Sequence, residues 1–374
     1  MDAPAPAERL HAMDHLRALA MLAGVLFHAA LAYSPVMRGF FPTADRQTSG
    51  WVDAVVWGLH LVRMPLFFFL AGFFAAWVIE RRGGTALARQ RVRRILVPFV
   101  VAWPLVEGSL AASTRWAALN VEHPSALLVA AREWMQRPDR PPLPPTTAHL
   151  WFLYYLLLLG VLHWAVRALE WGRGGPWLTS RSPQWLLLGL PLLLTPALAS
   201  VSAPHPAPEG LLPQFWAIGF YGAFYALGAL VHARRDWLER ARPLAPWLTA
   251  GSATLYAVFL TGLAAAPPSA GNTTASWGLA AVEACLSVWL TVLCLLVGLR
   301  LLNRPSPGLR YLSQAAYWTY LVHLPLLFAL QYALMDRGWP WPLKLALAVG
   351  ATLVGSLLTY QLLVRHTPLR RFVG

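Results

Sequence analysis

The sequence predicts an all-α membrane protein with about ten transmembrane helices and both termini in the cytoplasm. Of its 374 residues, 57% are hydrophobic and only 12% are charged, whereas soluble domains are about 25% charged. Apolar runs of about 20 residues, long enough to cross a bilayer, recur along the chain. The net charge of +14 comes almost entirely from arginines between those runs. This placement is typical of cytoplasmic flanks of membrane helices and argues against a nucleic-acid partner.

The predicted spans follow one another without an internal repeat or an attached soluble domain, so residues 1–374 are expected to form one transmembrane domain. The first fifteen residues lack an apolar core, so the first apolar run is expected to remain as a helix and not to be cleaved as a signal peptide. The expected spans are Leu16–Tyr33, Trp51–Ile79, Ile95–Ala112, His149–Leu169, Gln184–Val201, Leu212–Val231, Leu244–Ala265, Ser276–Leu299, Tyr311–Met335 and Trp341–Val364.

The arginines also predict the orientation. An even number of spans places both termini on one side. With that side cytoplasmic, 21 arginines lie in inner segments, seven lie in outer segments, and Arg63 alone lies within a span. The excess favours cytoplasmic termini. In the longest outer loop, the proline-rich stretch 137–145 is predicted to be extended and not helical.

The two cysteines predict neither a disulfide nor a metal site. Cys285 and Cys294 lie nine residues apart in one apolar run, about half a turn out of phase on a helix. No bound metal or cofactor is therefore expected.

Ionisable side chains at bilayer depth are costly, so each is a candidate site residue. At about 1.5 Å per residue, four such groups from four spans lie roughly 16–20 Å from the cytoplasmic surface; they are His28, Glu107, Glu283 and His323. His60 and Arg63 are expected nearer the outer surface. Each histidine taken singly could equally be a satisfied packing residue, and Glu107 would be a loop residue if the third span ended early.

Spacing predicts which groups share a face. Arg17 and His28 are 11 residues apart, about three helical turns, with Met21 and Gly24 between them. They would lie at the two ends of a shared cavity. Arg91 and Arg94 also share a face and, with Arg89 and Arg93, could bind a phosphorylated ligand. The alternative is that these arginines only anchor the helix at the inner surface.

Short motifs occur in a fixed order over nearly the whole chain. They are Asp14-His-Leu-Arg17 continuing to Phe27-His28, His60-Leu-Val-Arg63-Met64, Phe67-Phe-Phe-Leu-Ala-Gly-Phe73, Arg91-Val-Arg-Arg94 before Pro98, His149-Leu-Trp-Phe-Leu153, Tyr320-Leu-Val-His-Leu-Pro325 and Pro368-Leu-Arg-Arg-Phe372. Together they resemble the integral-membrane acyltransferase family 3, and within it the glucans biosynthesis protein C branch. One departure is Ala71, where the family usually has serine. The change keeps a small side chain and removes a hydroxyl.

The resemblance implies a ten-helix acyltransferase of the bacterial inner membrane. Its co-substrate would be cytoplasmic acyl-coenzyme A, with succinyl-coenzyme A expected, and its acceptor would be a hydroxyl of a periplasmic carbohydrate, here an osmoregulated glucan. Acyl transfer from a thioester to an alcohol needs a base for the hydroxyl proton. His28 is the expected base, because imidazole titrates near neutrality. His28 could act in one step or carry the acyl group transiently.

The remaining candidates are assigned around His28. Glu283 or Glu107 would orient its imidazole, as a carboxylate does in a catalytic triad, and His323 would be a second polar contact. Coenzyme A phosphates would be bound by Arg17, Arg91 and Arg94.

Arg63 lies too far from the inner surface to reach those phosphates. Its guanidinium is expected to bind a succinyl carboxylate or, alternatively, to pair with Asp53 or Glu283. An outer rim for sugar rings would be formed by His60, His149 and Trp151, although tryptophan is also a common interfacial anchor.

Two other functions fit parts of the sequence. One is an acetyltransferase for another exported glycan, such as O-antigen or peptidoglycan. The other is a proton-coupled transporter, for which the sequence offers no inverted repeat or paired broken helices.

Overall fold

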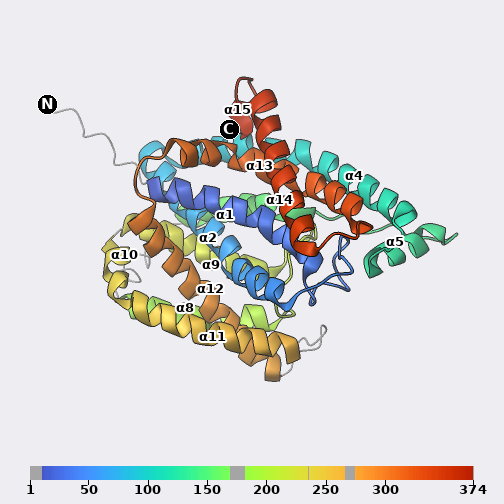
Figure 1. The fold of residues 1–374 in the computed structure, drawn as a ribbon. Helices are drawn as coiled ribbons and strands as arrows, with labels where there is room; N and C mark the ends of the chain where they lie inside the picture. Colours follow the sequence, from blue (N-terminus) through green and yellow to red (C-terminus); the bar gives the residue numbers. More distant parts are fainter. Residues whose placement is uncertain (1–10, 169–181, 235, 266–273, 374) are drawn as a thin grey trace.

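The computed structural model describes residues 11–168, 182–234, 236–265 and 274–373. All regular elements in this part of the chain are helical (Figure 1). The long helices are α1 (His11–Ala30), α2 (Gly50–Arg82), α4 (Val97–Asn120), α6 (Trp151–Ala168), α8 (Pro183–Ala199), α9 (Phe215–Ala233), α11 (Ala245–Ala265), α12 (Thr274–Leu301), α13 (Pro307–Met335) and α14 (Trp341–Thr359). Shorter elements are η1 (Leu31–Tyr33), α3 (Gly84–Arg91), η2 (Val92–Leu96), α5 (Ala126–Gln136), η3 (Ala148–Leu150), α10 (Asp236–Ala241), η5 (Arg242–Leu244), η6 (Tyr360–Val364) and α15 (Arg370–Val373).

The polytopic all-α fold class is confirmed. Within the described residues, nine helices are long and apolar enough to cross a membrane. The fifth predicted span corresponds to α8, which is apolar but only 17 residues long. Residues 169–181, which include the predicted end of the fourth span and Arg173 and Arg181, lie outside the described residues, as does Arg9. The cytoplasmic placement of the termini stays a prediction.

The third span is longer than predicted. Helix α3, the π-helical turn η2 and α4 join into one apolar helix from Gly84 to Asn120. Glu107 therefore lies inside a helix and not in a loop. A short amphipathic helix that was not predicted, α5, follows at Ala126–Gln136. The proline-rich stretch 137–145 is not helical, as expected.

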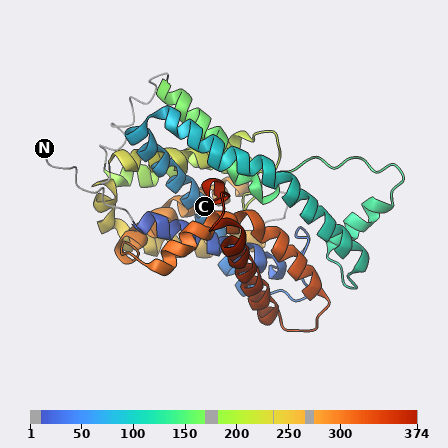
Figure 2. The same cartoon turned by 90° about the horizontal axis from the view of Figure 1, so that it is seen from above.

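Helix α1 lies in the middle of the bundle and contacts α2, α12, α13 and α14 (Figures 1 and 2). Helix α4 lies at the periphery and exposes large apolar side chains such as Val101 and Leu105. A lipid-facing helix is expected to do this. The interior face of α1 is the one that carries Met21 and Gly24, both buried.

Two glycines allow α2 and α9 to pack backbone to backbone. A Cβ atom on Gly72 would overlap the carbonyl oxygen of Tyr225, and one on Gly228 would overlap the carbonyl oxygen of Phe69. Small residues at such crossings allow the backbones of membrane helices to approach each other closely. The neighbouring Ala71 does not mediate this contact, because it lines a cavity described below.

We call the end of the bundle where α1 begins and α2 ends the arginine end, because Arg17, Arg81, Arg91, Arg94, Arg310 and Arg365 gather there. Loops at the opposite end are tied to one another. Lys344 Nζ lies 2.7 Å from Asp45 Oδ2 with both side chains almost fully buried, which joins the loop after α1 to α14. Thr147 N donates to the carbonyl oxygen of Glu209 at 2.7 Å, which joins the loops before α6 and α9.

The α2–α9 contact predicts a large difference between two glycines on the same helix. Gly228→Ala should lower the free energy of unfolding by about 2–3 kcal/mol, because the added methyl group must push two backbones apart. Gly219→Ala should leave it unchanged or raise it by up to about 1 kcal/mol, because nothing lies within 4 Å of that site and alanine favours helix. Unfolding of the two variants in detergent measures the difference. Equal effects would contradict the close approach.

Candidate functional site

Three histidines from three elements meet deep in the bundle. The rings of His28 on α1 and His323 on α13 have centroids 5.4 Å apart, and those of His323 and His149 on η3 are 5.0 Å apart. We call these three residues the donor cluster. His28 and His323, which the sequence placed at one depth, therefore lie side by side, and His149 joins them.

The backbone carbonyl of Tyr320 fixes two of these rings. It accepts from His149 Nε2 at 2.9 Å and from His323 Nδ1 at 2.8 Å. A carbonyl can only accept, so in the neutral imidazoles these nitrogens carry the protons. His149 Nδ1 and His323 Nε2 are then free acceptors, and both are buried without a hydrogen-bond partner. Buried polar atoms without a partner indicate a place where a ligand could supply one.

Arg63 lies beside this cluster without a carboxylate. Its guanidinium sits 4.2 Å from the centroid of the Phe27 ring, and a Cβ on Gly24 would be 3.1 Å from its Nη1. Among the described residues no acidic group pairs with Arg63, and its Nε has no partner. The predicted alternative pairs are not formed, because Asp53 binds Ser34 and Trp57 while Glu283 binds His205.

Arg63 and His60 also lie lower than the sequence predicted. Arg63 is level with Gly24 and His60 with Phe27, so both belong to the same layer as His28. The prediction was wrong because counting residues along a single helix ignores how two neighbouring helices are offset.

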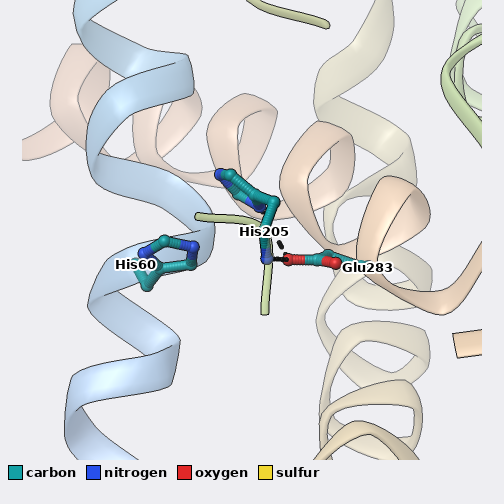
Figure 3. A group of neighbouring side chains, drawn as sticks. All are labelled: His60, His205 and Glu283. Atoms are coloured by element: carbon teal, nitrogen blue, oxygen red, sulfur yellow. Dashed lines mark hydrogen bonds and ion pairs between the residues drawn. The ribbon is translucent and has the colours of Figure 1, made fainter. Parts of the chain in front are cut away.

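A second cluster adjoins the first across Phe27. Figure 3 shows its three residues, His60, His205 and Glu283. Glu283 Oε1 on α12 accepts from both the backbone N of His205 at 3.0 Å and its ring Nδ1 at 2.7 Å. His205 Nε2 lies 3.1 Å from the hydroxyl of Tyr221. The His205 ring packs on His60 with centroids 4.2 Å apart. We call His60, His205 and Glu283 the loop cluster, because His205 belongs to the loop between α8 and α9.

The loop cluster is also where a metal ion could be held. His60, His205 and Glu283 can each offer one ligand atom, all within 4.8 Å of one another, and two histidines with a glutamate are a known zinc-binding set. Two of the three residues, His205 and Glu283, already have hydrogen-bond partners within the protein, however. Glu283 already accepts two hydrogen bonds from His205, and the two imidazoles are packed against each other.

A cavity of about 470 Å³ leads from the arginine end toward the donor cluster. Its lining includes Arg17, Arg91 and Arg94, but His28, which was predicted to share a cavity with Arg17, is not one of the lining residues. Its inner part is apolar and aromatic and ends at Tyr320, whose carbonyl binds two of the cluster histidines. The inner lining includes Met21, Phe67, Leu70, Ala71, Phe152, Leu153, Leu156 and Tyr317.

The π-helical turn η2 interrupts the Arg91–Arg94 motif. Such turns often occur at functional sites. Arg91 Nη2 lies 3.4 Å from the Tyr225 hydroxyl, and Arg94 also lines the cavity. Arg93 does not line it; its guanidinium lies 5.6 Å from the centroid of the Phe372 ring. Arg89 is not a lining residue either.

Two predicted site residues lie away from their expected positions. Glu107 accepts from Thr146 Oγ1 at 2.7 Å and is not beside His28. Neither Glu107 nor Glu283 orients the His28 ring, because depth along a helix does not determine which way a side chain faces. Trp151 is not on an exposed rim, because α6 begins at this residue and enters the bundle. It is 6% exposed, and its ring centroid lies 5.2 Å from that of Tyr221.

Sequence reasoning missed His205. It lies in a loop, so depth counting along helices excluded it, yet it is only 2% exposed. The available signal was weak: a histidine between two prolines in a short connection without arginine, Ala203-Pro-His-Pro206.

Comparisons with known proteins agree with the motifs. A family model described as an acyltransferase domain matches residues 10–361. Glucans biosynthesis protein C of Salmonella schwarzengrund (strain CVM19633) is 24% identical over 335 residues, which cover 86% of this chain and 83% of that protein. The proteins of the same name from Salmonella paratyphi B (strain ATCC BAA-1250 / SPB7) and Salmonella heidelberg (strain SL476) match equally. No solved structure matches the chain.

The arginines at the cavity mouth predict selective loss of binding to a phosphate-bearing ligand. Arg91→Ala and Arg94→Ala should each weaken coenzyme A binding about tenfold, since each removes a charged hydrogen-bond donor. Arg93→Ala should change it less than twofold, although it removes the same charge from the same turn. Isothermal titration calorimetry on the purified protein measures these affinities. Equal losses in all three variants would show that only net charge matters.

Proposed function

The chain belongs to the acyltransferase 3 family, and from this premise we propose that it transfers a succinyl group from succinyl-coenzyme A to hydroxyl groups of a periplasmic glucan. The acyl donor class follows from the family. The glucan acceptor is suggested by the name of the Salmonella relatives. Because the predicted topology puts 21 arginines on one side, we place the arginine end in the cytoplasm and the protein in the bacterial inner membrane.

The observation that carries the proposal is the continuous cavity from the arginines to Tyr320. Its cationic mouth suits the phosphates of coenzyme A, and its apolar inner part suits an uncharged pantetheine arm. Its volume of about 470 Å³ lies within the usual range for a pocket that encloses a small-molecule ligand. The thioester would then lie close to the donor cluster.

In the proposed reaction, the acceptor hydroxyl oxygen attacks the thioester carbonyl carbon while His28 takes the hydroxyl proton. The carbon–oxygen bond forms and the carbon–sulfur bond breaks. The imidazolium of His28 then returns the proton to the departing thiolate, so free coenzyme A thiol and a sugar ester are released. The free nitrogens of His149 and His323 offer further polar contacts for the reacting groups.

Arg63 supports a dicarboxylic donor. Arg63 is 8% exposed, and its guanidinium has no acidic partner among the described residues. A buried guanidinium is stabilised by a planar anion that can accept two hydrogen bonds. The free carboxylate of a succinyl group is such an anion, whereas an acetyl group has none.

Loss of His28 tests the function. His28→Ala should reduce succinyl transfer about 10²–10⁴-fold, as expected for loss of a general base. Mass spectrometry of periplasmic glucans from cells with wild-type protein, His28→Ala or no protein checks this. Wild-type glucans should be heavier by succinyl groups that the other two lack. A mass difference corresponding to acetate would favour the acetyltransferase alternative, and no difference would contradict a role in glucan acylation.

Donor choice tests Arg63. Arg63→Leu should lower transfer from succinyl-coenzyme A at least tenfold more than transfer from acetyl-coenzyme A, because only the first presents a carboxylate. Arg63→Lys should be intermediate, since it keeps the charge but not the two-pronged geometry. Initial rates with the two donors in detergent provide the measurement. Equal losses on both donors would rule out the carboxylate contact.

A further inference from the structure

We propose that the loop cluster of His60, His205 and Glu283 is the subsite that holds the acceptor sugar beside the donor cluster, where His28 takes the proton of the reacting hydroxyl. This assignment rests on the proposed acyl transfer and adds where the sugar binds. In it, His60 contacts the sugar, and His205 and Glu283 are positioning residues that act through His60. The expected ligand class is a neutral carbohydrate with free hydroxyl groups.

The hydrogen bonds determine which atom is free to bind. Glu283 accepts from His205 Nδ1, so that nitrogen carries a proton, and in the neutral imidazole His205 Nε2 is the acceptor. Tyr221 must then donate its hydroxyl proton to His205 Nε2. Both ring nitrogens of His205 are therefore occupied within the protein, and His205 itself has no site left for a substrate.

His60, by contrast, is held in place with a free nitrogen. Its ring lies between Phe27, with centroids 5.8 Å apart, and His205, with centroids 4.2 Å apart. Its Nε2 is buried and has no hydrogen-bond partner. A hydroxyl can donate to or accept from an imidazole nitrogen, so an acceptor sugar satisfies this atom.

The position of the loop explains how the two substrates meet. The loop between α8 and α9 lies at the end of the bundle opposite the arginines, where its Glu209 carbonyl accepts from Thr147 N. Trp216, partly exposed at the start of α9, has its ring centroid 5.9 Å from that of His205 and offers an aromatic face to a sugar ring. The acceptor would therefore arrive from this end and the donor from the arginine end. The two subsites adjoin at Phe27, whose ring lies 5.1 Å from that of His28.

The test separates acceptor binding from donor binding. In Glu283→Gln, which keeps an oxygen acceptor but removes the charge, KM for a gluco-oligosaccharide such as cellopentaose should rise at least fivefold. KM for succinyl-coenzyme A should stay within twofold. His60→Ala should raise the acceptor KM further, and His60→Gln should recover part of it. Equal changes in both KM values, or none, would overturn the assignment.

The chain contains a matched control. Asp336 also accepts from the backbone N of a histidine, His123, at 3.0 Å and from its Nδ1 at 3.2 Å, but it lies in an exposed loop contact. Asp336→Asn should leave both KM values unchanged. If it reproduced the effect of Glu283→Gln, loop anchoring in general and not an acceptor site would be responsible.

Two further measurements keep the assignment distinct from the proposed function. Cellopentaose binding without donor, followed by calorimetry, should be lost in His60→Ala even if the wild-type protein transferred no succinyl group. Succinyl transfer with an unchanged acceptor KM in His60→Ala would overturn the subsite alone. One zinc ion per purified chain, lost in His60→Ala, would also overturn it, because His60 would then be a metal ligand.

Discussion

The interior of the bundle excludes water, so every polar side chain held there must find a partner in the protein or in a ligand. Some groups are fully partnered. Lys344 pairs with Asp45, and Glu283 holds His205. Others are not: His60 Nε2, Arg63 Nε, His149 Nδ1 and His323 Nε2 lack hydrogen-bond partners within the described residues. Other buried atoms without a partner, such as Ser252 Oγ, Thr352 Oγ1 and Tyr360 Oη, lie on other helical elements, α11, α14 and η6. These four instead belong to residues that are linked by ring and cation–π contacts around Phe27 and His28.

Small residues make this concentration possible. Gly72 and Gly228 bring α2 and α9 into backbone contact, and Gly24 leaves room for the Arg63 guanidinium against α1. With larger side chains at these positions, α2 would lie farther from its neighbours. His60 and Arg63 on α2 would then not reach Phe27 and Gly24 on α1. The glycines thus contribute to the site without carrying any chemistry.

The site could be predicted in part. Helical spacing paired Arg91 with Arg94, the family resemblance grouped them with Arg17, and all three line one cavity. Depth counting correctly brought His28 and His323 to one layer. It failed for Glu107, which faces Thr146, and for the level of Arg63, because the offset and rotation of neighbouring helices depend on side-chain packing between them. It could not find His205, since a loop has no helical rise to count.

The sequence by itself determined that this is a membrane protein of many helices and the family to which it belongs. Hydropathy and arginine placement report on transfer from water to lipid, which is a property of composition and local order. Only the tertiary structure decided which polar groups meet. The pairing of His205 with Glu283, residues 78 positions apart in the sequence, arises because the loop between α8 and α9 folds into the bundle. That fold depends on contacts among several helices, which no local pattern encodes.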